Sequence, residues 1–173
     1  MIADATKVAA LVFVVALVQV SLLSSVEILG GTPDLVLVTL VAIALLRGSI
    51  FGACAGFAAG LLVDTANLGT LGVTSLLLTL AGYWIGRYGE TTGRDRGHAP
   101  FLSVLVVTVL YAFGALILHY MLGQDASARA VLLDGLPPGV FFNLLLTLPV
   151  YAVVRRVLRP TRVEAVPEVR LLG

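Results

Sequence analysis

The chain has 173 residues, of which 59% are hydrophobic and only 12% are charged, and its mean hydropathy is +1.05. This composition excludes an ordinary soluble domain, and the charged residues gather between long apolar runs. The net charge of +1 gives no indication of a nucleic-acid partner. We therefore expect an integral membrane protein whose helices form its single domain.

The first two apolar runs predict a long helix followed by a short one. The run at about 8–26 is close to the ~20 residues that cross the hydrocarbon core, and no signal-peptide cleavage pattern follows it. The run at 33–47 starts with a Thr-Pro-Asp sequence, which predicts Thr32 as the N-cap and Asp34 in the first helical turn. It ends at Arg47, where a tight turn leads into the next helix.

The third run, at about 49–64, carries the most distinctive pattern in the chain. Alanines fill much of the space between glycines that recur every fourth residue, at Gly48, Gly52, Gly56 and Gly60. On a helix this spacing leaves a groove without side chains, which lets another helix approach closely in a bilayer. Two occupants remain open, a partner's transmembrane helix or a helix of the same chain. The only cysteine, Cys54, is expected to be a small buried packing residue.

Three further runs complete the predicted bundle. They lie at about 71–88, 100–121 and 138–158, and the first of them ends in an aromatic belt typical of membrane interfaces. Between the last two, residues 125–133 predict a short helix lying in the outer interface. The fold class we expect is an all-α integral membrane protein, a transmembrane bundle of six helices over residues 1–160.

The basic residues predict how this bundle is oriented. With six spans, every Lys and Arg except Arg129 falls on one side of the membrane. The positive-inside rule makes that side cytoplasmic, with both termini there, in the plasma membrane of a bacterium. Residues 161–173 then form a cytoplasmic basic tail. Just before it, Arg155 and Arg156 are expected to attract anionic lipids or to dock a cytoplasmic filament protein.

The sequence contains no pattern for catalysis, for a metal or for a cofactor. Both histidines, His98 and His119, fall at predicted interfaces, and no charged residue lies near the middle of a span. A single cysteine provides no set of thiols for a metal. We therefore expect a protein that is not an enzyme and holds neither a metal nor a cofactor.

Three positions in or near the spans can carry a polar contact or a bend. Asp64 can cap the outer turn that follows its helix, or it can meet a basic or amide group of a partner chain. Asn143 needs a hydrogen-bond partner inside the membrane, and Pro149 removes a backbone donor to the carbonyl of Leu145. Either these two residues form an internal contact and a kink, or they shape a cavity or partner groove open to the outer face.

Together these features resemble the family of the rod shape-determining protein MreD over roughly residues 8–160. The resemblance rests on Pro33-Asp34 before an apolar run, on GxxxGLLxD from Gly56 to Asp64, on Leu71-Gly72 at the head of the fourth helix, and on Asn143, Pro149 and Arg155-Arg156 in the last. It implies a fold similar to the substrate-binding subunits of energy-coupling-factor transporters, with a cavity that opens outward.

The resemblance also implies a non-enzymatic subunit of the bacterial cell-elongation machinery, which carries out peptidoglycan synthesis. Family members are associated with MreC, a single-span protein, and with the MreB filament and the wall-synthesising polymerase and transpeptidase. We predict that the transmembrane helix of MreC docks on the groove of small residues. The candidate partner-binding residues are Gly52, Gly56, Gly60, Asp64, Asn143, Pro149, Arg155 and Arg156.

The alternative function is a vitamin-binding subunit of an energy-coupling-factor transporter. Such a subunit needs polar and aromatic groups that converge in the outer half of the bundle. The candidates for that role are Gln19, His119, Phe141, Phe142 and Asn143.

Overall fold

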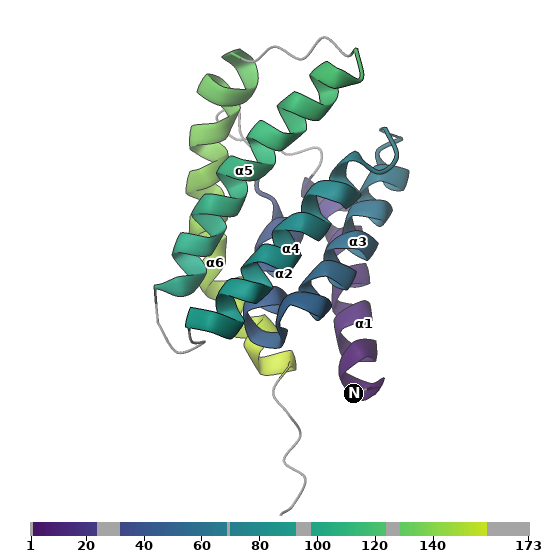
Figure 1. Cartoon of the computed structure of the whole chain (residues 1–173), viewed down its shortest axis with the longest axis vertical. Coiled ribbons are helices and arrows are strands. Elements are labelled where there is room, and N and C mark those ends of the chain that lie inside the picture. Colours follow the sequence, from purple (N-terminus) through teal and green to yellow (C-terminus); the bar gives the residue numbers. More distant parts are fainter. Residues whose placement is uncertain (1, 24–31, 69, 93–97, 124–128, 159–173) are drawn as a thin grey trace, which may run out of the picture.

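The computed structural model describes residues 2–23, 32–68, 70–92, 98–123 and 129–158, and it shows a bundle of α-helices (Figure 1). The elements are α1 (Ile2–Val18), η1 (Gln19–Leu23), α2 (Leu35–Arg47), α3 (Ser49–Ala66), α4 (Val73–Thr92), α5 (Ala99–Met121), η2 (Ala130–Gly135) and α6 (Leu136–Val157). The two segments named η are π-helical. In Figure 1, α1 begins and α6 ends at the lower end of the bundle, which we call the proximal end. The opposite end, where α2 begins and α3 turns into α4, is the distal end.

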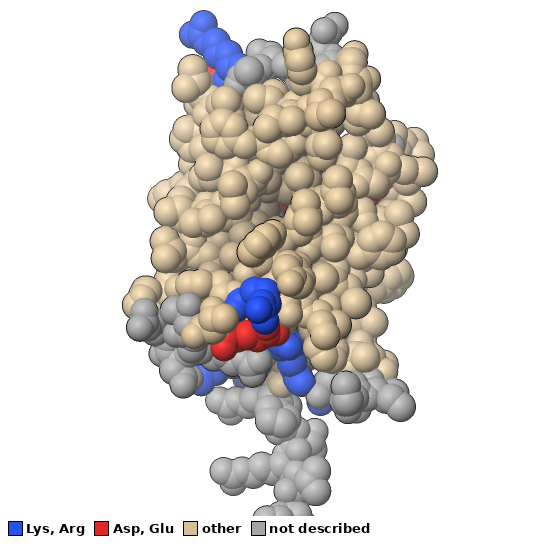
Figure 2. Space-filling model, in the orientation of Figure 1, with Lys and Arg blue, Asp and Glu red and all other residues tan. Residues whose placement is uncertain are grey.

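The helices have the composition of a membrane protein. In the described part of the chain, three of them are long and apolar enough to cross a membrane, namely Ser49–Ala66, Ala99–Met121 and the continuous stretch Ala130–Val157. Shorter apolar helices cover Ala5–Ser21 and Leu35–Arg47. On the face seen in Figure 2, charged side chains lie toward the two ends and an uncharged band separates them. The predicted all-α, membrane-type fold is confirmed.

Helix α2 forms the core of the bundle. All ten residues from 36 to 45 are buried, and α1, α3, α4, α5 and α6 all contact this helix. A helix that is hydrophobic on every side is one that other helices surround. The sequence fits this position because α2 is an unbroken series of Leu, Val, Ile and Ala, interrupted only by Thr39 before its final arginine.

The structure corrects the predicted start of α2. Asp34 is the N-cap instead of Thr32, because its Oδ1 accepts a hydrogen bond from the backbone N–H of Leu37 at 2.9 Å. The reason is a contact from η1, the preceding element, in which Nε2 of Gln19 donates to the carbonyl of Pro33 at 3.2 Å. This bond holds the proline before the helix and outweighs its preference for the first helical position.

The structure also corrects the interfacial helix predicted at 125–133. Its described part belongs to η2, which leads without a break into α6, so it is not a separate helix. Residues 124–128 lie outside the described residues, and so does the predicted basic tail at 161–173.

Helices α3 and α4 form the most extensive helix pair, and glycines make their close approach possible. A Cβ atom at Gly52 would collide with the carbonyl oxygen of Gly82, and one at Gly56 with the carbonyl oxygen of Leu78. A Cβ at Gly60 would collide in the same way with the backbone of α4. Of the two occupants left open by the sequence, the structure places a helix of the same chain in the glycine groove.

Cys54 is exposed, so the prediction that it is a buried packing residue was wrong. Two residues along a helix correspond to a rotation of roughly 200°, which directs Cys54 away from the face that carries Gly52. The four-residue spacing therefore divides α3 into a glycine face against α4 and an opposite face that α4 does not cover.

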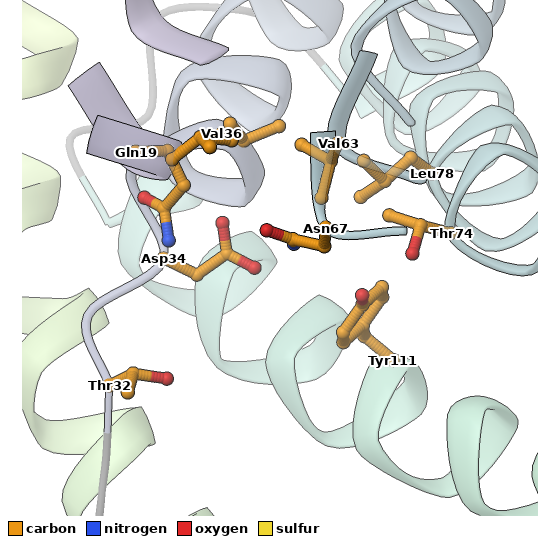
Figure 3. A pocket seen from close by; sticks show the side chains of 10 residues that line it. Gln19, Thr32, Asp34, Val36, Val63, Asn67, Thr74, Leu78 and Tyr111 are labelled. Atoms are coloured by element: carbon orange, nitrogen blue, oxygen red, sulfur yellow. The ribbon is translucent and has the colours of Figure 1, made fainter. Parts of the chain in front are cut away.

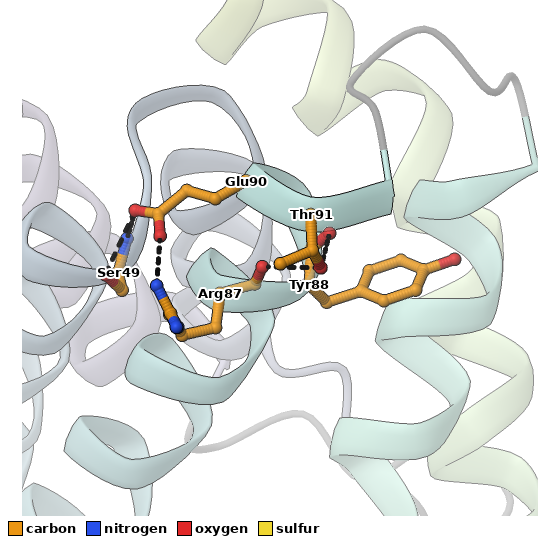
Figure 4. Close-up of polar contacts among 5 residues, drawn as sticks. All are labelled: Ser49, Arg87, Tyr88, Glu90 and Thr91. Atoms are coloured by element: carbon orange, nitrogen blue, oxygen red, sulfur yellow. Dashed lines mark hydrogen bonds and ion pairs between the residues drawn. The ribbon is translucent and has the colours of Figure 1, made fainter.

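The proximal turn between α2 and α3 is fastened by a carboxylate from α4. Gly48 has a φ of +92°, a conformation that favours glycine. Oε1 of Glu90 accepts hydrogen bonds from the backbone N–H of Ser49 at 2.7 Å and from its hydroxyl at 3.0 Å (Figure 4). The other oxygen of Glu90 pairs with Arg87 at 3.5 Å. A side chain thus satisfies a backbone donor at the start of α3, where no helical partner exists.

We predict that Gly56→Ala destabilises the protein by about 1–3 kcal/mol, because the added Cβ must push two helix backbones apart. The matched control is Gly139→Ala on α6, where an added Cβ meets no atom within 4 Å. The measurement is the thermal unfolding temperature of both purified variants in the same detergent. Equal unfolding temperatures would show that α3 and α4 do not depend on this contact.

Candidate functional site

The distal start of α2 lies inside the bundle, and side chains from three elements satisfy its backbone. The N–H of Asp34 donates to Oδ1 of Asn143 at 2.8 Å, and the N–H of Leu35 donates to Oε1 of Gln19 at 2.9 Å. The N–H of Leu37 donates to Oδ1 of Asp34 itself. The first N–H groups of a helix have no partner within the helix, so these three bonds replace those that water would form elsewhere.

Asn143 lies on α6 and connects this helix start to α5. Its Nδ2 donates to the hydroxyl of Thr108 on α5 at 3.1 Å, and its own carbonyl accepts from the hydroxyl of Thr147 at 2.7 Å. All three side chains are buried. The prediction that Asn143 finds an internal hydrogen-bond partner is confirmed. Helix α6 continues through Pro149, which lies exposed on its surface.

Asp64 is buried at the distal turn and caps the start of α4. Its Oδ2 accepts from the N–H groups of Gly72 at 2.8 Å and Ser75 at 3.2 Å, and its Oδ1 accepts from the N–H of Thr74 at 3.3 Å. A carboxylate at a helix N-terminus is also favoured by the helix dipole. This geometry matches the capping role predicted for Asp64. The backbone that Asp64 caps lies after the turn, at the start of α4.

Two cavities meet at the start of α2. The first, which we call the distal cavity, has a volume of about 380 Å³, and six polar side chains line it together with apolar ones (Figure 3): Gln19, Thr32, Asp34, Asn67, Thr74 and Tyr111. The second, of about 260 Å³, shares Thr32, Asp34 and Tyr111 with the first and reaches Asn143 on α6. Asp34 therefore faces both cavities.

Among the described residues that line the two cavities, Asp34 is the only charged one. In Figure 3 its carboxylate points into the distal cavity toward the side chain of Asn67, while the hydroxyls of Tyr111 and Thr74 lie on the opposite wall. The surroundings are suited to holding a small polar group. In the described part of the chain, no group of three or more His, Cys, Asp or Glu residues is arranged to hold a metal ion.

A separate apolar groove lies between α1 and α3. Its volume is about 510 Å³, and the small residues Ala5 and Ala9 of α1 and Cys54 and Ala58 of α3 are among those that line it. Larger apolar side chains, among them Phe13, line it as well. The groove uses the face of α3 that is turned away from α4, so the helix has close-packing surfaces on two sides.

The structure divides the predicted partner-binding residues into two groups. The first group is buried between helices of this chain and consists of Gly52, Gly56, Gly60, Asp64 and Asn143. Those that lie exposed on α6 are Pro149, Arg155 and Arg156. Burial or exposure of these residues does not test whether they contact another chain, so partner binding stays a prediction.

The residues predicted for a vitamin site are not brought together. Gln19 and Asn143 line the cavities, whereas Nδ1 of His119 lies 2.7 Å from the carbonyl of Ala115 in its own helix. Phe141 is 64% exposed and stacks edge-on against Phe142. Asn67, Thr74 and Tyr111 also line the distal cavity, and they were not predicted from the sequence. The one available signal was the Thr-Pro-Asp sequence at the start of an otherwise apolar helix.

Comparison with known protein families identifies the family to which this chain belongs. The family described as rod shape-determining protein MreD matches residues 5–160, nearly the whole chain. The chain belongs to the MreD family. Neither the curated proteins nor the solved structures gave a match. Membership in the MreD family confirms the resemblance drawn from the sequence, and it assigns the chain a role in the determination of rod shape as a membrane protein.

We predict that Asn143→Leu destabilises this MreD-family chain by about 1–3 kcal/mol, because the N–H of Asp34 and the hydroxyl of Thr108 lose their partner. The control is Thr65→Val, since the hydroxyl of Thr65 is exposed and bonds only to carbonyls of its own helix. Thermal unfolding in detergent measures both variants. A loss in Asn143→Leu no larger than in the control would show that this network is dispensable.

Proposed function

We propose that this chain is a non-enzymatic scaffold subunit of the bacterial cell-elongation complex, which directs peptidoglycan synthesis. The family supplies the role in rod shape. The polar residues of the candidate site support a structural role, because most of them are bonded to helix ends and not arranged as a nucleophile with its base. A protein of this kind acts by holding other chains in position.

We propose that the bundle spans the bacterial cytoplasmic membrane six times, as a single domain over residues 1–160, with both termini in the cytoplasm. The described basic residues support this orientation. Those near the proximal end are Lys7, Arg47, Arg87, Arg155 and Arg156, whereas the distal end carries Arg129 with Asp34, Asp64 and Asp134. An excess of Lys and Arg marks the cytoplasmic side.

The observation that carries the docking proposal is the apolar groove between α1 and α3. We propose that the transmembrane helix of MreC occupies it. Inside a bilayer, helices associate through close van der Waals packing, and small residues such as Ala9 and Ala58 permit that approach. Gly52, Gly56 and Gly60 contribute indirectly, because they seat α3 against α4 and so fix the position of the groove.

The proximal end offers a different kind of surface. Arg155 and Arg156 are exposed in the last turn of α6. We propose that they face the cytoplasm, where they attract anionic lipids and lie within reach of the MreB filament. The wall-synthesising polymerase and transpeptidase belong to the same proposed assembly on the basis of the family alone.

The vitamin-binding alternative has less support. A fold similar to the substrate-binding subunits of energy-coupling-factor transporters stays a prediction. Of its five candidate residues, Gln19 lines the distal cavity and Asn143 the second cavity, and the other three line neither. Gln19 and Asn143 are both already bonded to the start of α2, so neither is free to select a ligand.

The docking proposal predicts that Ala9→Leu weakens co-purification of MreC about tenfold, because the larger side chain fills the groove and costs about 1.4 kcal/mol of helix packing. Ala58→Leu acts from the other wall of the groove and should have the same effect. The measurement is the amount of MreC recovered with the tagged chain from membranes.

The matched control is Ala10→Leu. Ala10 is the neighbouring residue on α1, and it is exposed but does not line the groove. Full recovery of MreC with Ala9→Leu and Ala58→Leu would exclude the groove as its docking site. Equal loss with Ala10→Leu would place the contact elsewhere on α1.

A further inference from the structure

Within the part of the chain that the structure describes, the carboxylate of Asp34 lies among the helices without a counter-charge. It is half-buried because it faces the two cavities, and its hydrogen bonds come from the first turn of α2, such as that from the N–H of Leu37 at 2.9 Å. No Lys, Arg or His in the described part of the chain forms an ion pair with it. A carboxylate among helices in a membrane is unfavourable unless it is paired.

The other described residues of the distal cavity supply neutral polar groups and no second charge. Thr32 and Thr74 contribute hydroxyls, Asn67 a carboxamide, and Tyr111 a hydroxyl and an aromatic face. Carboxylate and hydroxyl oxygens accept hydrogen bonds from a cation, and an aromatic face attracts one. An anion would instead be repelled by Asp34. The chemistry of the wall therefore selects a positively charged group that carries N–H donors.

Part of the wall of the distal cavity is held by hydrogen bonds, and the cavity is of suitable size. Both polar atoms of the Gln19 carboxamide are bonded, Nε2 to the carbonyl of Pro33 and Oε1 to the N–H of Leu35, and Oδ1 of Asp34 accepts from the N–H of Leu37. A site whose walls are already fixed loses little entropy when a ligand enters. A volume of about 380 Å³ lies within the range of small-molecule pockets.

We propose that the distal cavity binds a primary ammonium group, which pairs with the carboxylate of Asp34 and donates hydrogen bonds to the neutral wall. Two sources present this chemistry, a free small amine and the ethanolamine headgroup of a lipid in the leaflet next to the distal end. This inference goes beyond the scaffold function, because it requires neither MreC nor the groove between α1 and α3.

The test uses the full chain in nanodiscs of phosphatidylglycerol, titrated with ethylammonium chloride and followed by calorimetry and thermal unfolding. We expect saturable binding and a raised unfolding temperature. Asp34→Asn keeps the size of the side chain and its ability to cap α2, but it removes the charge, and we expect binding at least tenfold weaker. Asp134→Asn removes an exposed distal carboxylate that lines neither cavity, and binding should be unchanged.

Asn67→Leu is a second variant that removes a wall group without touching the start of α2, and it should weaken binding several-fold. Nanodiscs that contain phosphatidylethanolamine distinguish the sources. If they stabilise the wild type but not Asp34→Asn while ethylammonium has no effect, the headgroup is the ligand. An Asp34-dependent effect of ethylammonium identifies a free amine.

Two results overturn the proposal. In the first, neither ethylammonium nor phosphatidylethanolamine distinguishes the wild type from Asp34→Asn. In the second, the neutral molecule 1-propanol binds as tightly as ethylammonium, which would show that the cavity selects its ligand by shape and not by charge.

Discussion

A backbone N–H group inside a membrane must find its hydrogen-bond partner within the protein, and this constraint organises the whole bundle. Helix α2 has only 13 residues, fewer than the ~20 that cross a bilayer, and other helices surround it. Its distal end therefore lies inside the bundle, where its first N–H groups need hydrogen bonds to side chains. Gln19, Asp34 and Asn143 complete them at the distal end. Asp64 does the same for α4, and Glu90 for α3.

The short central helix also explains where the cavities lie. In Figure 1, α2 begins below the tops of α5 and α6, and the two cavities lie beside this start. Among the described residues, polar side chains from the end of α3, from α4 and from α5 line the cavities together with Asp34. Asp34 thus caps the start of α2 with one carboxylate oxygen and also presents its charge to the cavity. Stability and any ligand binding at this end are coupled through Asp34.

Features that depend on local spacing could be predicted from the sequence. The glycine repeat predicted a close helix contact. A capping role at the outer turn was one of the two roles predicted for Asp64, and the backbone donors that it caps, at Gly72 to Ser75, lie within eleven residues of it along the chain. The helices at about 49–64 and 100–121 agree closely with α3 and α5. Each of these predictions rests on residues that are neighbours in one helix or across one turn.

Features that depend on long-range contacts could not be predicted. The glycine spacing indicates that a helix approaches but not which helix, and only the structure identified α4. The start of α2 is set by Gln19 and by Asn143, which is 109 residues away from Asp34 along the chain. Thr74 and Tyr111 are ordinary residues for their helices, and their shared cavity follows from how the bundle packs.

The claim that side chains close the distal helix ends inside the bundle is tested most directly by hydrogen exchange of single amides in a bilayer. The amides concerned are those of Asp34, Leu35, Leu37, Gly72, Thr74 and Ser75. First-turn amides of a helix in water exchange rapidly, because they lack helical partners. The account predicts that these six exchange as slowly as amides in the middle of α2, and rapid exchange at all six would contradict it.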